Sequence, residues 1–337
     1  MANIMLTYRC NLRCSYCFAN EFVNKEKTDF SIKNFLEAVT FITRSGENAI
    51  GLIGGEPTLH PGFNVIMEML IANPNVKSIR LFTNGLILDQ FMSQIIHPKV
   101  TVHVNCNSPL IIGEQAYTRT LKNLDTMILQ YGMKNRVQLG INLFSDDMDY
   151  RYIMDLLQRY DMHSLRTSLT VPDFAINRKA DVLNDFKKRK QFLLKFYHDM
   201  DSIKVMPYSD CNRPPYCVWT DEEKEWLKGF VAKYPGISTN LLHPDSHCIP
   251  AIDILPDLQA IRCFGMSDFL KVPISDFKNV ADITKFFMDR IDSVACKLPA
   301  CEECKGCYEQ KIGACYAGCL GFKATRIRAC NDAIERL

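Results

Sequence analysis

Three cysteines near the start of the chain have the spacing of a metal-cluster site. Cys10, Cys14 and Cys17 form a C-x3-C-x2-C pattern directly after a short apolar run that predicts a first strand. Cysteine thiolates bind iron–sulfur clusters, and a purely electron-carrying cubane usually takes four of them. Three thiolates leave one iron open, and an open metal position is where a substrate or cofactor binds.

A structural zinc site is the alternative for these cysteines. Such a site uses four ligands, usually as two C-x2-4-C pairs. The next histidine in the sequence is His60 and the next cysteine is Cys106, so no fourth ligand follows closely. The spacing and the position after a strand favour the iron–sulfur cluster.

The stretch 6–18 resembles the signature of the radical S-adenosylmethionine (radical SAM) superfamily, down to the aromatic Tyr16 before the last cysteine. The resemblance implies that Cys10, Cys14 and Cys17 are the catalytic residues and hold a 4Fe–4S cluster whose open iron chelates SAM. It also implies a low-potential reductant, such as flavodoxin or ferredoxin. One electron then cleaves SAM to a 5′-deoxyadenosyl radical, which abstracts a hydrogen atom from the substrate.

Further residues match the places where the superfamily contacts SAM. Gly54-Gly55-Glu56 follows the second predicted strand and resembles the family's GGE motif, in which small residues let the backbone approach the SAM amine. An ordinary turn, a solvated helix face or a core strand are the structural alternatives for these positions. The resemblance implies that the SAM contacts are Tyr16, Gly54, Gly55, Glu56, Asn105, Arg119 and Asn142.

Strand and helix patterns alternate up to residue 171. The predicted strands are 3–8, 49–53, 78–83, 100–105, 137–143 and 164–171, with helical patterns between them. Alternating βα units with right-handed crossovers build a parallel sheet. Six units predict an α/β fold, a partial (β/α)6 TIM-like barrel, whose chemistry lies at the C-terminal ends of the strands. The cysteine loop follows the first strand, and the radical SAM core has this fold.

Nine of the fifteen cysteines lie from Cys248 onward. Cys248 and Cys263 flank a predicted hairpin at 254–261, turning at Pro256 and Asp257. The pattern resembles the SPASM domain, a small cysteine-rich domain that carries two auxiliary 4Fe–4S clusters in many radical SAM enzymes. It departs from the family in a longer middle gap and in Leu258, where a glycine is usual. The resemblance assigns one cluster to Cys248, Cys263 and Cys319, and the other to Cys304, Cys307, Cys315 and Cys330.

The first auxiliary cluster lacks a fourth ligand in this pattern. Either its last iron is open to substrate, or another cysteine completes it. The alternative is a pair of zinc sites, because C-x2-C with C-x3-C is also zinc spacing. Cys106 has no assigned role, and the candidates for the missing ligand are Cys211, Cys217, Cys296 and Cys301.

The 337 residues are enough for about two domains. We expect a radical SAM barrel at 1–205, a bridging segment at 206–245 and the SPASM-type domain at 246–337. The bridging region is predicted to follow a short strand at 203–206. It contains a capping box at Thr220 and Glu223 that predicts a helix through Val231.

Composition limits the partners and the compartment. A formal charge of +2 gives no electrostatic case for nucleic acid or for an anionic membrane surface. No apolar run approaches the ~18 residues of a spanning helix, and no secretion signal is visible. The many cysteines therefore indicate metal ligands in a reducing compartment, and we expect a cytoplasmic protein.

The resemblance implies an oxidoreductase that modifies a peptide or protein, as in the biosynthesis of ribosomally made, post-translationally modified peptides (RiPPs). Cross-linking, epimerisation and oxidation all begin with the same hydrogen abstraction. The first strand begins at Asn3, so we expect no N-terminal domain for a leader peptide; a separate protein or the barrel itself presents the substrate. The alternatives are a radical SAM dehydrogenase acting on a small molecule, and a non-enzymatic electron-transfer or zinc-scaffold protein.

Overall fold

The computed structural model describes residues 2–17, 19–20, 22–25, 28–170, 182–242, 248–267 and 269–335. The chain forms two compact units, each built from two segments. Unit 1 comprises Met1–Gly140 and Pro250–Lys285, and unit 2 comprises Ile141–Ile249 and Phe286–Leu337. These units divide the chain at places other than the predicted domain bounds, which stay a prediction.

Unit 1 is built on a sheet in which β1 to β5 pair in parallel, each with the next. The strand order is β10-β9-β8-β1-β2-β3-β4-β5. The strands are β1 (Ala2–Met5), β2 (Ala49–Ile53), β3 (Ser78–Thr83), β4 (Val100–Asn105), β5 (Val137–Leu143), β8 (Asp253–Ile254), β9 (Gln259–Ile261) and β10 (Lys271–Pro273).

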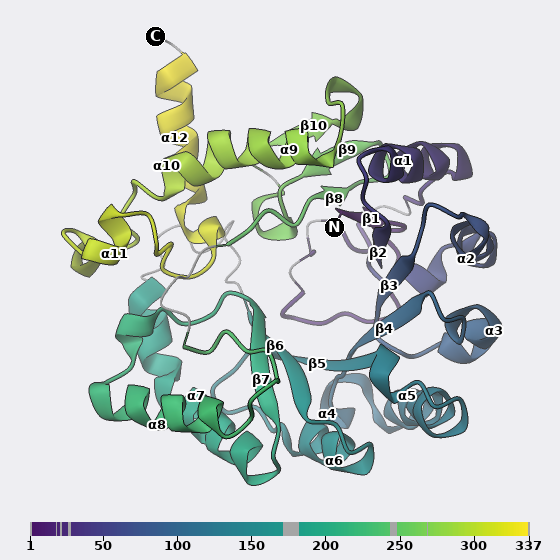
Figure 1. The fold of residues 1–337 in the computed structure, drawn as a ribbon, viewed down its shortest axis with the longest axis horizontal. Helices are drawn as coiled ribbons and strands as arrows, with labels where there is room; N and C mark the ends of the chain where they lie inside the picture. The colour runs from purple at the N-terminus through teal and green to yellow at the C-terminus, as the bar shows by residue number, and fades with distance from the viewer. Residues whose placement is uncertain are drawn as a thin grey trace. The chain divides into compact units, whose positions relative to one another are not determined.

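The helices of unit 1 cover one side of this sheet. In Figure 1, α1, α2, α3 and α5 lie along the same side of strands β1–β4. Helix α1 begins after Ser31, whose hydroxyl accepts a hydrogen bond from the Asn34 N–H at 3.1 Å, and it buries Phe35, Val39 and Ile42 on one face. The helices are α1 (Ile32–Arg44), α2 (Phe63–Ala72), α3 (Met92–Ile95), α4 (Pro109–Ile112), α5 (Glu114–Asp125) and α9 (Val280–Phe287), which ends in unit 2.

Unit 2 contains a parallel pair of strands, β6 (Ser164–Leu169) and β7 (Met206–Cys211). The predicted capping box is present at the start of α8, where the side chains of Thr220 and Glu223 each accept the other's backbone N–H. The helices are α6 (Arg151–Arg159), α7 (Val182–Ser202), α8 (Asp221–Ala232), α10 (Ser293–Ala295), α11 (Tyr308–Lys311) and α12 (Ala324–Glu335).

The predicted bounds of β2, β3, β4 and β5 are confirmed, whereas the strand predicted at 203–206 is wrong. Helix α7 extends to Ser202, and the chain then turns through Lys204, which has a positive φ of 59°. The Val205 N–H donates to the Met200 carbonyl at 3.0 Å and closes the helix end. The strand therefore begins only at Met206. Pro207 is tolerated near the start of β7, because β7 pairs with β6 and is the last strand in the order of its sheet.

The hairpin predicted at 254–261 is confirmed by the antiparallel pairing of β8 with β9. Leu258 in its turn has a φ of 64°, in the left-handed region that favours glycine. The Leu258 N–H donates to Leu255 at 2.9 Å, and its carbonyl accepts from Ile274 at 3.0 Å. The turn needs a left-handed residue here, and these hydrogen bonds hold a leucine in that conformation.

A buried polar row crosses three strands of unit 1. Asn3 on β1 is the register partner of Gly51 on β2 and of Asp253 on β8. A Cβ atom on Gly51 would lie 1.9 Å from the Asn3 side-chain oxygen, so only glycine leaves room for this amide. The Asn3 amide donates to Asp253 at 2.7 Å. Burial raises the pKa of the Asp253 carboxyl to about 7, although this hydrogen bond opposes the shift.

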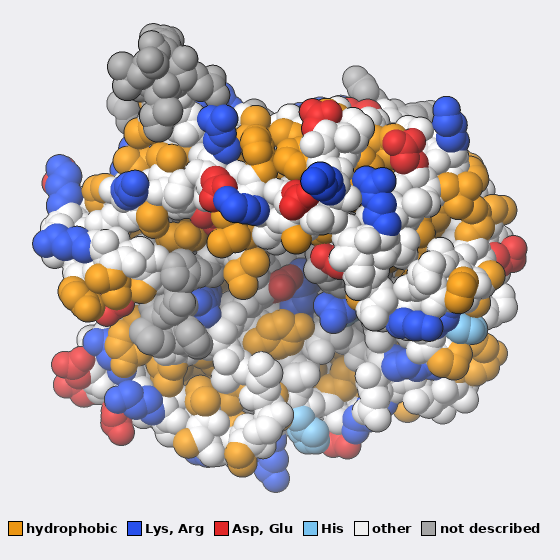
Figure 2. Space-filling view, turned by 45° about the horizontal axis from the view of Figure 1, so that its top comes forward, with side chains coloured by type: hydrophobic (Ala, Val, Ile, Leu, Met, Phe, Trp, Pro, Cys, Tyr) orange, Lys and Arg blue, Asp and Glu red, His pale blue; other side chains and the backbone are white. Residues whose placement is uncertain are grey.

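One face of the molecule is shown in Figure 2, where Lys and Arg side chains lie among Asp, Glu and hydrophobic ones. Charges of opposite sign that lie together partly cancel at a distance. Within the part of the chain that the structure describes, no helix combines the length and apolar character needed to cross a membrane.

We predict that Asp253→Asn stabilises the protein at neutral and alkaline pH. Because the folded-state pKa of Asp253 is raised, the native state binds more protons than the unfolded state between about pH 4 and pH 7, so wild-type stability falls as pH rises through that window. The variant keeps an acceptor for Asn3 and has no proton to lose. Its free energy of unfolding at about pH 8 should exceed that of wild type by roughly 2–4 kcal/mol.

Denaturant unfolding followed by circular dichroism from about pH 4 to pH 8 measures this difference. The control is Asp149→Asn, because Arg151 lowers the pKa of that exposed carboxyl to about 2, outside the window. A wild-type stability that rises between about pH 5 and pH 7 by an amount dependent on Asp253 would contradict the prediction.

Candidate functional site

The cysteine loop leaves the C-terminal end of β1 between two backbone partners. On one side, the Leu6 N–H donates to the Ile53 carbonyl of β2 at 2.8 Å. On the other, the Tyr8 N–H donates to Thr28 at 2.9 Å, and the Phe30 N–H donates to Leu6 at 2.8 Å. The residues leading to Cys10 therefore continue the sheet on both sides before the loop begins.

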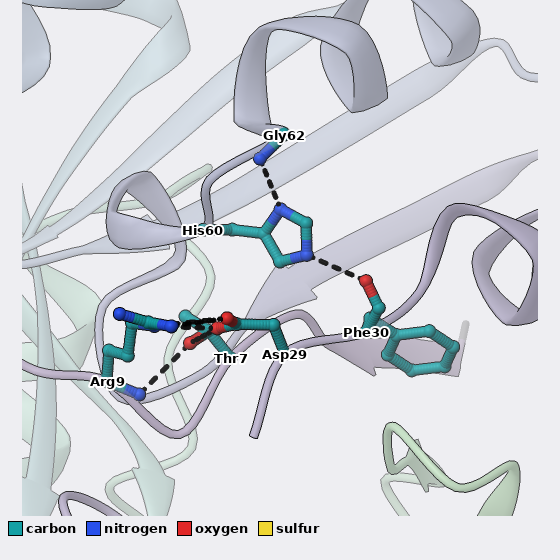
Figure 3. A network of polar contacts seen from close by, with 6 residues as sticks. All are labelled: Thr7, Arg9, Asp29, Phe30, His60 and Gly62. Carbon is teal, nitrogen blue, oxygen red and sulfur yellow. Dashed lines mark hydrogen bonds and ion pairs between the residues drawn. The ribbon is translucent and has the colours of Figure 1, made fainter. Parts of the chain in front are cut away.

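A polar network fixes the last residues before Cys10 (Figure 3). The Arg9 guanidinium donates to both carboxylate oxygens of Asp29, the shorter contact being 2.7 Å, and the Thr7 hydroxyl donates to the same carboxylate at 2.6 Å. Burial alone would raise the pKa of Asp29, but the Arg9 and Thr7 hydrogen bonds and the Arg9 charge lower it. A bidentate pair fixes orientation as well as distance.

His60 ties the loop after β2 to the same segment. Its Nε2 lies 2.8 Å from the Phe30 carbonyl, and its Nδ1 accepts the Gly62 N–H at 2.9 Å, so the proton is on Nε2 (Figure 3). Phe30 follows Asp29 directly. The histidine is buried, and both of its ring nitrogens form hydrogen bonds with backbone groups, which gives it a structural role.

Gly54 and Gly55 face the backbone that leads into the cysteine loop. A Cβ atom on Gly55 would lie 2.3 Å from the Arg9 carbonyl oxygen, and one on Gly54 would lie 2.7 Å from the Thr7 carbonyl oxygen. The Gly55 N–H donates to Thr7 at 2.8 Å, and the next N–H, of Glu56, donates to Arg9 at 2.7 Å. The sequence predicted glycines that admit a ligand; the structure gives them a second task, the close approach of two protein backbones.

Glu56 is buried and joins the ends of β2 and β3. One carboxylate oxygen accepts from the hydroxyls of Thr58 at 2.6 Å and Thr83 at 2.8 Å, and the other accepts the Asn84 N–H at 2.8 Å. Burial raises the pKa of Glu56, and these hydrogen bonds oppose that shift. Both oxygens are engaged by the protein, so its carboxylate holds the strand ends in place.

Asparagines connect the cysteine loop to neighbouring segments. The Asn84 amide after β3 donates to the Asn11 side chain at 2.7 Å, and the Cys10 N–H donates to Asn24 at 2.9 Å. The Tyr16 hydroxyl donates to Asn107, just after β4. Thus the loop that carries the three cysteines is tied to the ends of β3 and β4.

Tyr16 lies at the meeting point of the loop and β4. Burial raises the pKa of its hydroxyl, Cys14 adds to the shift through its charge and a hydrogen bond, and a hydrogen bond with Asn105 opposes it. Of the predicted SAM contacts, Tyr16 and Asn105 are therefore brought together beside Cys14.

The three thiols share a partly buried environment. The pKa of Cys10 is raised to about 11, mainly by burial; the Leu12 N–H opposes the shift, and the charges of Glu56, Cys14 and Cys17 add to it. Burial likewise raises the pKa of Cys14 and Cys17. Thiols placed like this are protonated at neutral pH, and binding to a cationic iron centre would convert them to thiolates with release of protons.

The donor set fits an iron–sulfur cluster. Three half-buried thiols lie within range of one another's charge. Cysteine thiolates are the ligands of iron–sulfur clusters, and three of them leave one iron of a cubane open to a further ligand.

Two further predicted SAM contacts are Arg119 and Asn142. Arg119 on α5 forms an exposed ion pair with Asp89, both of whose oxygens lie 3.1 Å from it. Asn142 is half-buried on β5, within the part of that strand assigned to unit 2. Their roles toward SAM stay predictions.

Unit 2 gathers a second set of cysteines that are far apart in sequence. The sulfur atoms of Cys301 and Cys304 lie 3.4 Å apart. Burial raises the pKa of Cys217, and the charges of Cys315, Cys304 and Cys307 add to the shift, so Cys217 lies within electrostatic range of these three thiols.

Cys211 is paired separately with Cys319. A hydrogen bond from the Cys319 thiol lowers the pKa of Cys211, against the effect of burial. The next residue, Asn212, accepts the Cys319 N–H at 3.1 Å. Of the remaining predicted ligands, Cys330 lies half-buried on α12, while Cys248 and Cys263 lie in different units.

Residues 4–154 match the Radical SAM superfamily. The chain contains a radical SAM domain. A radical SAM domain implies a 4Fe–4S cluster and SAM as its cofactors, and the cysteine loop, Gly54-Gly55-Glu56, Asn105 and Asn142 all lie inside the matched range.

Solved structures confirm the predicted partial-barrel fold. Streptococcus suis SuiB bound to S-adenosylmethionine superposes with a TM-score of 0.59 over 94% of this chain and 72% of that one, at 13% identity. A second SuiB structure gives 0.54 over 84% of this chain. At such identity the likeness is one of fold.

The curated relatives match only part of this chain. Molybdenum cofactor biosynthesis protein moc-5 of Caenorhabditis elegans is 27% identical over 44% of this chain and 29% of its own length. GTP 3',8-cyclase of Clostridium perfringens is 26% identical over 46% of this chain and 49% of its own. The chain thus spans less than half the length of these relatives.

Several residues that build the radical SAM site carry no signal in the sequence. Asp29 and Asn24 lie in an irregular segment, and only their contacts with Arg9 and Cys10 reveal them. Asn84 stands before Gly85, and an Asn-Gly pair is a signal for a turn rather than for a ligand. Only Asn107, which follows a predicted strand end, lay where polar ligands are expected.

We predict that Gly55→Ala lowers cluster content as well as SAM binding. The new Cβ would displace the Arg9 carbonyl and with it the adjacent Cys10. Iron bound by anaerobically reconstituted protein should fall by up to roughly four atoms per chain, the content of one cubane. Gly229→Ala is the matched control, because a Cβ there meets no atom within 4 Å. Full iron content with weakened SAM binding would instead assign Gly55 to the ligand alone.

Proposed function

We propose that this protein is a radical SAM enzyme with a SPASM-type C-terminal region that modifies a peptide or protein. The observation that carries the proposal is the second gathering of cysteines in unit 2, outside the matched radical SAM range. A radical SAM domain needs one cluster. A further set of thiols supplies ligands for auxiliary clusters, which accept an electron or bind substrate in net oxidations.

In the first site, Cys10, Cys14 and Cys17 would hold the cluster. Bound together, the cluster and SAM would supply the radical chemistry that abstracts a hydrogen atom from the substrate. The chain's own residues orient this pair: Arg9, Asp29 and Asn24 hold the loop at Cys10, while Tyr16 packs beside Cys14. The Gly54–Gly55 backbone and Asn105 border the loop from β2 and β4.

In unit 2, Cys304, Cys307 and Cys315 would hold one auxiliary cluster. The charges of all three raise the pKa of Cys217, so Cys217 is a candidate fourth ligand, as an alternative to the predicted Cys330. Cys319, assigned with Cys248 and Cys263 to the other cluster, has Cys211 as its hydrogen-bond partner. Cys211 is therefore the best-supported candidate for the ligand missing from that set.

A small-molecule substrate is the second candidate. The favouring observation is the similarity to proteins named GTP 3',8-cyclase, which covers 46% of this chain in the Clostridium perfringens relative. More than half of this chain lies outside that similarity. The two candidates differ in a measurable way, because only one predicts turnover with peptides.

The substrate class is tested by measuring 5′-deoxyadenosine release. Reconstituted enzyme with SAM and dithionite should release it slowly alone, and several-fold faster with the right member of a panel of short peptides encoded beside the gene. Mass spectrometry should then show a changed peptide mass. Cys14→Ala should abolish both signals, because the loss of a thiolate removes the cluster that delivers the electron.

Two outcomes would redirect this assignment. Stimulation by GTP with no peptide altered would favour the nucleotide candidate. Release of 5′-deoxyadenosine by the Cys14→Ala variant would remove the catalytic role of the cysteine loop altogether.

We predict about 12 irons per chain in reconstituted wild type and about 8 when Cys10, Cys14 and Cys17 are all replaced by Ala. In that triple-alanine chain, Cys217→Ala should change the iron content or the spectrum of an auxiliary cluster if Cys217 is a ligand. Cys330→Ala is compared side by side, and the buried thiol of Cys106 provides the control substitution. Zinc in place of iron would overturn the auxiliary clusters.

A further inference from the structure

Lys323 is a buried positive charge among the cysteines of unit 2. Its exposed fraction is only 1%, and it directly precedes α12. Among the described residues its ammonium donates one hydrogen bond, to the Ala295 carbonyl at 2.9 Å, and forms no ion pair with a carboxylate. An ammonium removed from water without a negative partner is costly, so another source of negative charge is expected nearby.

The surroundings of Lys323 identify that source. Ala295 immediately precedes Cys296, and Tyr316, whose ring centre lies 5.8 Å from the ammonium, immediately follows Cys315. Burial and the charge of Arg326 lower the pKa of Lys323 to about 8, while the thiolate charges of Cys315, Cys304 and Cys296 oppose this. Cysteine sulfurs are thus the negative groups identified around this lysine.

We propose that Lys323 is the built-in counter-charge of the auxiliary cluster held by Cys304, Cys307 and Cys315, and that it raises the reduction potential of that cluster. The inference rests on the proposed auxiliary clusters. A cluster with thiolate ligands carries net negative charge, and reduction by one electron adds another. A buried cation stabilises the reduced form more than the oxidised form, because the low dielectric of the interior strengthens the attraction.

The role differs from that of an ordinary structural lysine in the sign of two effects. Without iron the negative charge of a cluster is missing beside the buried Lys323, so Lys323→Met should stabilise the apo-protein or leave it unchanged. With the cluster bound, the same substitution should lower the reduction potential. A lysine that acts only through its hydrogen bond to Ala295 would destabilise the apo-protein and leave the potential unmoved.

The test uses full-length chains in which Cys10, Cys14 and Cys17 are Ala, so that only auxiliary clusters titrate. Lys323→Met and Lys323→Arg are compared by dithionite titration followed by electron paramagnetic resonance. We expect Lys323→Met to shift the reduction equilibrium of one cluster at least tenfold toward the oxidised form, which is 59 mV for one electron. Lys323→Arg keeps the positive charge, so its reduction equilibrium should stay close to that of the chain with Lys323.

Lys305→Met is the matched control. Lys305 follows Cys304 directly, but it is exposed and paired with Glu302 at 2.6 Å, so water screens its charge. Its substitution should change the equilibrium less than twofold. Thermal melts of the apo-proteins complete the comparison. The Lys323→Met chain should melt at or above the melting temperature of the chain that keeps Lys323.

Each result decides the question. Unchanged potentials at full iron content, or a Lys323→Met apo-protein that melts lower or fails to fold, would overturn the counter-charge role. Loss of auxiliary iron from a folded Lys323→Met chain, with iron kept by Lys323→Arg, would support it. If the Lys323-containing chain binds no auxiliary iron at all, the cluster proposal itself fails, and that count is made first.

Discussion

The approach of two backbones at the end of β1 and β2 is the constraint on which the site of unit 1 depends. Gly54 and Gly55 lie so close to Thr7 and Arg9 that neither has room for a Cβ atom. This contact continues the parallel pairing of β1 with β2 beyond the regular strands and delivers the chain to Cys10 at a fixed point. The Arg9–Asp29 pair then sets the direction in which the loop leaves.

A second constraint is electrostatic, and both groups of cysteines share it. Partly buried thiols resist ionisation, as the raised pKa values of Cys10 and Cys217 illustrate. Metal supplies most of the positive charge that thiolates need. In unit 2 the chain adds a cation of its own, Lys323, whereas the charged partners identified at Cys10 are all negative. The two sites are therefore expected to differ in their electron affinity.

The polar residues around the cysteine loop divide into two kinds by what their side chains contact. Glu56 and His60 form hydrogen bonds with other protein groups and join strand ends and loops. Tyr16 lies beside Cys14 and has a hydrogen bond with Asn105, and both side chains stay predicted contacts of the cofactor. Motif membership alone treats Glu56 and Tyr16 alike, whereas burial and hydrogen bonding separate a brace from a candidate contact.

The sequence by itself determined the features that depend on neighbours a few residues apart. Apolar patterns set four of the strand bounds, the Thr220 capping box set the start of α8, and the spacing of Cys10, Cys14 and Cys17 pointed to a cluster. Tertiary structure decided which distant groups meet: Asp29 at Arg9, Cys217 beside Cys304, and Lys323 among the thiols. Local patterns act through the geometry of one turn or strand. Contacts between residues tens of positions apart exist only once the whole chain has packed, so no short stretch of sequence records them.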